Sequence, residues 1–157
     1  MSIAQFYKCE ATDSDIAVLC RAWGWRIPEF RSVVVVSAFG DVFFRDEQGQ
    51  VYWLNTGTAE VALAATSIDE FWEKAQQESG ANWFMPKLVV ALASAGKERR
   101  TGQCYTYAVL PIFAEGKYEI WNFTAVDLRE HFQLTGEVHK EIFGLPEGAH
   151  VKVVVGP

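Results

Sequence analysis

The sequence predicts an α+β fold, a single domain in which a mostly antiparallel sheet packs against three to four helices. Two observations predict this class. The expected order is one helix, three or four strands, two helices, two strands, a helix and a final strand, so elements of one kind cluster. The chain has 157 residues, half of them hydrophobic, which suits one domain with a core of its own.

Residues 13–23 are predicted to form the first helix. Leu19 and Trp23 recur at helical spacing on its apolar side. Thr12 or Asp13 can cap its first turn, because a short polar side chain accepts a hydrogen bond from a free backbone amide.

Three or four strands are expected next. The valine run 33–36 is β-branched and too short for a helix, so it predicts a strand covered on both faces. The turn 46–49, with Gly49 near the position that needs a positive φ, predicts a hairpin. The expected strand segments are 32–38, 41–45, 50–54 and 60–64.

Two helices should follow the strands. Ser67 and Glu70 have the spacing of a capping box, which predicts a helix that starts there and is closed by Gly80. The next helix is expected over residues 83–95, with Pro86 in its first turn, where a missing N–H does least harm. Its apolar residues cover more than half of the circumference, so deep burial is expected.

The last third predicts two strands, a helix and a strand. Residues 103–110 alternate loosely, and residues 118–126 alternate with a large aromatic face. Asp127 is expected to cap the helix, and a short strand is expected at 151–155. The predicted buried stripe of that helix comprises Leu128, Phe132, Thr135, Val138, His139 and Ile142.

The predicted organisation is a helical N-terminal extension, residues 1–36, followed by an α+β domain, residues 37–157. The first residues lack the basic and apolar regions of a signal peptide, and no apolar stretch is long enough to cross a membrane. Cys9, Cys20 and Cys104 are odd in number and widely spaced, which predicts free thiols. We therefore expect a cytoplasmic protein without a membrane partner.

Charge limits the classes of partner. Lys and Arg total 14 and Asp and Glu total 20, so the net charge is −6. An acidic chain is poorly suited to bind nucleic acid directly but is compatible with a basic protein partner. The pattern makes no prediction about oligomeric state.

No set of residues predicts catalysis, so no catalytic residue, metal site or cofactor is expected. His131 and His139 stand eight residues apart on one helix, whereas metal-binding pairs usually stand four apart. Cys104, His131 and Asp127 could be written as a thiol-protease set, but no nucleophile motif surrounds the cysteine. We therefore expect a protein that is not an enzyme.

Four tryptophans are expected in the core, because they lie among apolar residues at strand or helix spacing and not among Lys and Arg. They are Trp53, Trp72, Trp83 and Trp121.

Several motifs carry a resemblance to a known family. Residues 102–105, the proline-containing loop that leads to Gly116, and Asn122 ahead of residues 126–128 fit its pattern. The other matching segments are 136–142, 144–146, 39–44, 49–56 and the helix from Ser67. Over roughly residues 37–153 the chain resembles the C-terminal domain of type VI secretion immunity proteins that neutralise DNase effectors. In longer relatives a GAD-like domain precedes it, and about 36 residues are too few for that domain here.

The resemblance implies a non-enzymatic binding protein that neutralises a cognate, basic nuclease toxin by stoichiometric occlusion. Acidic residues on or beside hairpin tips would then face the toxin; the candidates are Asp41, Asp46, Glu47, Glu115 and Glu119. Two alternatives stay open: a regulatory or ligand-sensing α+β module unrelated to toxins, and an enzyme of unrecognised type.

Overall fold

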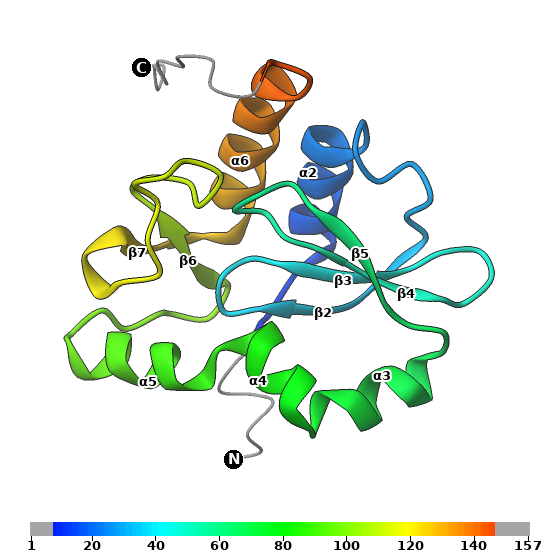
Figure 1. Cartoon of the computed structure of the whole chain (residues 1–157), viewed down its shortest axis with the longest axis horizontal. Coiled ribbons are helices and arrows are strands. Elements are labelled where there is room, and N and C mark those ends of the chain that lie inside the picture. Colours follow the sequence, from blue (N-terminus) through cyan, green and yellow to red (C-terminus); the bar gives the residue numbers. More distant parts are fainter. Residues whose placement is uncertain (1–7, 147–157) are drawn as a thin grey trace.

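A computed structural model describes residues 8–146 and confirms the α+β class. Five strands form one antiparallel sheet and two form a second, smaller sheet (Figure 1). The strands are β1 Lys8–Cys9, β2 Ser32–Ser37, β3 Val42–Arg45, β4 Val51–Leu54, β5 Val61–Ala65, β6 Gln103–Tyr107 and β7 Phe123–Asp127. The helices are α2 Asp13–Trp23, α3 Ile68–Ala75, α4 Glu78–Phe84, α5 Pro86–Ser94, the 3₁₀ turn η1 Ile120–Asn122 and α6 Leu128–Ile142.

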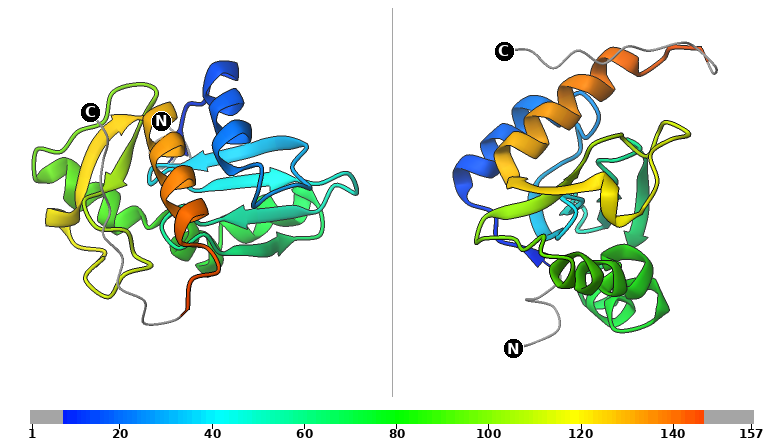
Figure 2. Two further views of the ribbon diagram at one scale, coloured as in Figure 1. Left: turned by 90° about the horizontal axis from the view of Figure 1, so that it is seen from above. Right: turned by 90° about the vertical axis from the view of Figure 1, so that its left-hand side faces the viewer.

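The larger sheet is an antiparallel meander in the order β1-β2-β3-β4-β5, and β6 pairs with β7 in the smaller one. Helices α2 and α6 lie on one side of the sheets, and α3, α4 and α5 lie on the other (Figure 2). A hydrogen bond of 2.7 Å from the Tyr105 amide to the Ala38 carbonyl ties β6 to the end of β2. The two sheets therefore meet where β2 ends.

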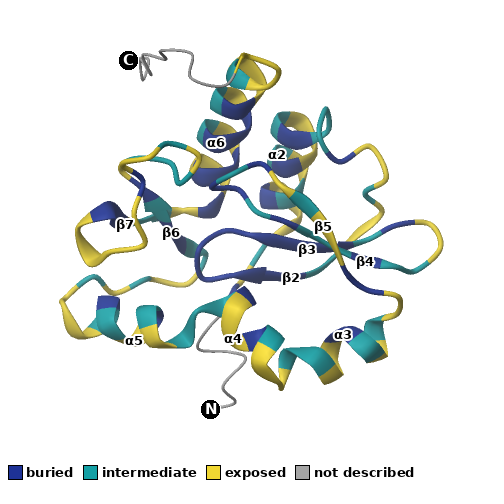
Figure 3. Ribbon diagram, viewed as in Figure 1, coloured by how far each residue is buried: buried dark blue, intermediate teal, exposed yellow. Residues whose placement is uncertain are grey.

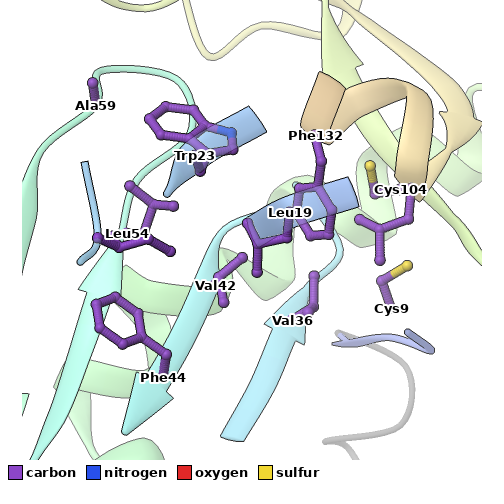
Figure 4. Packing of buried hydrophobic residues seen from close by; sticks show 12 residues of the cluster. Cys9, Leu19, Trp23, Val36, Val42, Phe44, Leu54, Ala59, Cys104 and Phe132 are labelled. Carbon is purple, nitrogen blue, oxygen red and sulfur yellow. The ribbon is translucent and has the colours of Figure 1, made fainter. Parts of the chain in front are cut away.

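The core beneath α2 and α6 follows from strand alternation, because successive side chains of a strand point to opposite faces. Val42 and Phe44 of β3 pack toward Leu19 and Trp23 of α2 and Phe132 of α6 (Figure 4). All five side chains are almost fully buried. The core on this face of the sheet therefore joins residues from the start, the middle and the end of the described chain.

The opposite face of the sheet has its own core. Phe43, between Val42 and Phe44, packs against Phe71 of α3 and Trp83 of α4. A third cluster covers the smaller sheet and includes Val89 and Leu92 of α5. The valine-rich strand is thus covered on both faces, as predicted.

Residues 8–36 are part of the same packed unit. The predicted boundary between residues 36 and 37 falls inside β2, and β1 pairs with the last residues of that strand. Helix α2 packs closely on α6: a methyl group at Gly136 would lie 2.6 Å from the Ala22 carbonyl oxygen. The Trp23 indole also donates a hydrogen bond of 3.2 Å to the Thr135 hydroxyl.

Helix α2 and the hairpin of β3 and β4 have the predicted positions. Thr12 caps α2 in a capping box with Asp15, and Gly49 has the positive φ that its turn requires. The prediction for the next helix was wrong at its end. Ser67 caps α3, but that helix ends at Ala75, and Gly80 lies inside α4.

Three further predictions need correction. Only Val89 and Leu92 of α5 are fully buried, so that helix is a cover and not a deep core element. Residues 118–122 form an irregular segment and a 3₁₀ turn, so β7 starts at Phe123. Asp127 stands at the N-cap of α6 without making a side-chain cap hydrogen bond. The strand expected at 151–155 lies outside the described residues.

A buried chain of hydrogen bonds connects both sheets to α6. Asp41 accepts from the Thr56 amide at 3.0 Å, and its Oδ1 lies 3.1 Å from the Thr56 hydroxyl. That hydroxyl lies 2.8 Å from Nε2 of His131. Nδ1 of the same ring lies 2.8 Å from the hydroxyl of Thr106 in β6. We call these four residues, Asp41, Thr56, His131 and Thr106, the buried polar chain.

The donor directions in the buried polar chain follow from its charges. Ionised Asp41 can only accept, so the Thr56 hydroxyl donates to it and in turn accepts from His131 Nε2–H. Thr106 then donates to the unprotonated Nδ1. Burial lowers the pKa of His131 to about 3, which keeps this ring neutral near neutral pH. A neutral imidazole with its proton on Nε2 therefore satisfies both hydrogen bonds of the His131 ring.

Gly40 is required beside this chain. It has φ +77°, and a methyl group there would lie 2.3 Å from Cδ2 and Nε2 of His131. Gly102 has φ +81°, yet a methyl group there would meet nothing within 4 Å. The two glycines share a backbone constraint but differ in the space around them.

We expect Gly40→Ala to lower the free energy of unfolding by about 1–3 kcal/mol more than Gly102→Ala, because only the first adds overpacking to the backbone cost. Urea unfolding of both variants and the unchanged protein measures the difference. Equal losses would show that the His131 ring can move aside at no cost.

The buried Asp41 and His131 make the stability of the fold depend on pH. Burial raises the pKa of Asp41 from 3.8 to about 6, against the opposing effect of hydrogen bonds from Thr56 and Trp53. The stability that protonated Asp41 contributes is present below pH 4 and is lost as pH rises to 6, by about 3 kcal/mol. Neutral His131 has the opposite effect: its contribution is present above pH 6.5 and is lost as pH falls toward 3.

The two effects oppose each other between pH 4 and 6. We therefore expect Asp41→Asn to make the free energy of unfolding rise more steeply with pH in that window, by about 1.4 kcal/mol per pH unit. Urea unfolding at half-unit steps from pH 4 to 7 tests this. Parallel curves for the variant and the unchanged protein would contradict the assignment.

Candidate functional site

The five acidic candidates occupy different environments. Asp41 is 2% exposed and belongs to the buried polar chain, so the proposal that it faces a partner is corrected. Asp46 is also buried, and its carboxylate accepts from the amides of Gln48 and Gln50 to hold the hairpin turn. Glu47 is exposed at the same tip, 3.5 Å from a guanidinium nitrogen of Arg31. The structure therefore does not bring the five acids together on one surface. Of the three that precede β4, only Glu47 is exposed.

The two remaining candidates lie on one segment. Residues 108–122, which we call the β6–β7 loop, connect the strands of the smaller sheet. Glu115 and Glu119 are both exposed on this loop. Their roles in partner binding stay predictions, and the loop supplies the surface on which to consider them.

Much of the β6–β7 loop is exposed (Figure 3), and several of its exposed residues are large and apolar. Trp121 is 53% exposed, so its expected place in the core was wrong. Its indole donates a hydrogen bond of 2.7 Å to the Glu119 carboxylate. The other exposed apolar residues of the loop are Ile112, Tyr118 and Ile120. Because aromatic side chains are enriched at protein interfaces, the exposed rings make this loop a candidate interaction surface.

Asn122 holds the base of the loop. Its side-chain oxygen accepts from the Val109 amide at 2.7 Å, and its side-chain nitrogen donates to the carbonyls of Val109 and Lys117 at 2.9 Å each. Gly116 is buried where a methyl group would lie 2.1 Å from the Leu110 carbonyl oxygen. Lys97 adds hydrogen bonds of 2.8 Å to the carbonyls of Ile120 and Phe123. The backbone of the loop is therefore held by the side chains of Asn122 and Lys97.

A hollow of about 380 Å³ opens between this loop and α6. Most of its lining is apolar and includes Val109, Leu110, Phe113, Leu134 and Val138. The threonine hydroxyls of its lining, on Thr106 and Thr135, already bond to His131. Tyr107 also lines the hollow, and its hydroxyl is buried. Glu115 is the one charged residue among the described residues that line it.

The buried chemistry favours a structural role. Because the pKa of His131 is about 3, it is a poor general base at neutral pH. Burial raises the pKa of the Cys104 thiol well above its usual range, which opposes formation of a thiolate nucleophile. Within residues 8–146, no three His, Cys, Asp or Glu side chains gather closely enough to hold a metal ion. No helix in that range is both long and apolar enough to cross a membrane.

Sequence reasoning missed both the buried polar chain and the exposed surface. Thr56 and His131 are separated by 75 residues, so no local pattern links them. Pro111 and Gly116 indicate a loop between the two strands, but they precede residue 118 and do not show that β7 starts only at Phe123.

Comparisons with known proteins agree with this fold. One solved structure, described as the crystal structure of Atu4351 from Agrobacterium tumefaciens, is similar with a TM-score of 0.53 and 12% identity. The similarity covers 87% of this chain and 68% of that one, and at this identity it concerns the fold alone. No curated protein matches the chain.

A family match concerns α3 to α6, including the β6–β7 loop and His131. The predicted resemblance extended over roughly residues 37–153, so the matched range is shorter at both ends. Residues 65–139 match the family described as the type VI secretion immunity protein Tdi1, C-terminal, and the predicted resemblance is confirmed over that range.

Proposed function

We propose that this protein is an immunity protein that binds a cognate bacterial nuclease toxin and neutralises it by stoichiometric occlusion. The observation that carries the proposal is the aromatic and acidic surface of the β6–β7 loop, which lies inside the family match. Such a protein would act in the cytoplasm, where the DNA that a nuclease attacks is located.

The loop has the two properties that this function requires. Trp121 and Tyr118 are large and exposed, and they lie on a loop whose backbone is fixed by hydrogen bonds. Aromatic residues that become buried on binding supply much of the binding energy of protein interfaces. Glu115 and Glu119 stand beside them and, with the net charge of −6, would attract a basic surface. Nucleases that grip phosphates present such a surface at the cleft.

A second candidate function is a ligand-sensing binding module. The observation that favours it is the mostly apolar hollow of about 380 Å³, because small-molecule sites commonly have this size and lining. The two candidates differ in whether a protein or a small molecule occupies this side of the molecule.

Co-expression tests the proposed function. We expect this protein to protect cells from the toxin encoded beside its gene, and the pair to elute as a stoichiometric complex. A toxin that stays lethal, with no complex in solution, would contradict the proposal for that pair. Protection without a complex would favour an indirect regulatory role.

A matched pair of tryptophan variants locates the interface. We expect Trp121→Ala to weaken toxin binding by about 30-fold, corresponding to about 2 kcal/mol for an anchor residue. Trp72→Ala serves as the control, because Trp72 is 37% exposed on α3, away from the β6–β7 loop (Figure 1). Titration calorimetry with the purified toxin measures both, and equal affinities for the two variants would remove the loop from the interface.

A further inference from the structure

We infer that the hollow between the β6–β7 loop and α6 receives a lysine or arginine side chain of the partner, with its charged end at Glu115. The inference rests on the proposed function, and it specifies the chemistry of the contact. The apolar lining of this hollow and the single charged residue in it, Glu115, support the inference.

The lining of the hollow suits a long aliphatic stem. Val109, Leu110 and Phe113 on the loop face Leu134 and Val138 of α6 across it. Because the hydroxyls of Thr106 and Thr135 already bond within the protein, they leave no strong demand for a polar ligand. Burial of methylene groups in this hollow would be favourable, because it removes apolar area from water.

Glu115 selects the charge of the occupant. Its carboxylate makes no hydrogen bond or ion pair with any residue between 8 and 146. A purely apolar side chain placed here would remove water from the carboxylate without replacing it, which is costly for an ionised group. Lysine and arginine combine an apolar stem with a cationic end, so they satisfy both parts of the cavity.

A second acid lies on the same loop, outside the lining of the hollow. Glu119 is exposed on the same loop, and its carboxylate is oriented by the Trp121 indole. The site therefore fits a basic segment of a protein, with one side chain inserted.

Binding to the toxin gives the first test. We expect Glu115→Gln to weaken affinity at least tenfold, and Val138→Phe, which fills the hollow, to do the same. Glu73→Gln on α3 is the matched control, because Glu73 is exposed and lies away from this loop (Figure 1). If the unchanged protein binds the toxin and Glu115→Gln binds equally well, the inference is wrong while the proposed function stands.

A probe independent of the toxin separates the two failures. We expect n-butylguanidinium to shift the amide resonances of Val109, Leu110 and Glu115 in the unchanged protein, with a much smaller effect in Glu115→Gln. An absence of shifts at saturating probe would overturn the inference, even if the toxin is bound. Equal shifts by n-butanol, in both proteins, would also overturn it, because they would identify a site for uncharged ligands. Failure of toxin binding alone, with the guanidinium shifts present, would contradict the proposed function and leave the site chemistry supported.

Discussion

The fold depends on one neutral imidazole. His131 lies between the Thr56 hydroxyl and the Thr106 hydroxyl, at 2.8 Å from each, and so connects the larger sheet, the smaller sheet and α6. These groups would be costly to bury without partners, so the contact specifies how the layers meet. It also joins the segment that matches the Tdi1 family, which contains Thr106 and His131, to the preceding part of the chain, which contains Asp41 and Thr56.

The acidic residues separate into two groups with different physical roles. Asp41 and Asp46 are buried and satisfy backbone amides or side chains, so they organise turns and do not contribute to a surface. Glu115 and Glu119 are exposed beside apolar side chains. Formal charge alone does not distinguish these groups, because each contributes one unit to the total of −6.

Local patterns predicted the elements whose signals are local. The cap at Thr12, the turn at Gly49 and the valine run 33–36 indicated α2, the hairpin and a strand covered on both faces. The pattern at Gly80 was misinterpreted because that glycine permits close packing inside a helix. A methyl group there would lie 1.8 Å from the Ala75 carbonyl oxygen.

Long-range and surface features were not predictable in the same way. The contacts of His131 join residues far apart in the chain, so they emerge only from tertiary packing. Trp121 fits an alternating pattern but lies in a 3₁₀ turn, where period-two alternation no longer determines which side is buried. The candidate site was therefore predicted through two of its acids and missed in its aromatic part.

The hydrogen bonds of Asn122 have a consequence for how such a protein can evolve. They fix the β6–β7 loop through backbone groups of Val109 and Lys117, so the loop path does not depend on the exposed side chains. Where the loop binds a partner as proposed, substitutions at positions such as 119 and 121 would then alter recognition with little cost to folding. Divergent lineages could acquire mutually exclusive partners on one conserved scaffold, because specificity is a difference between affinities and each exposed position changes it separately.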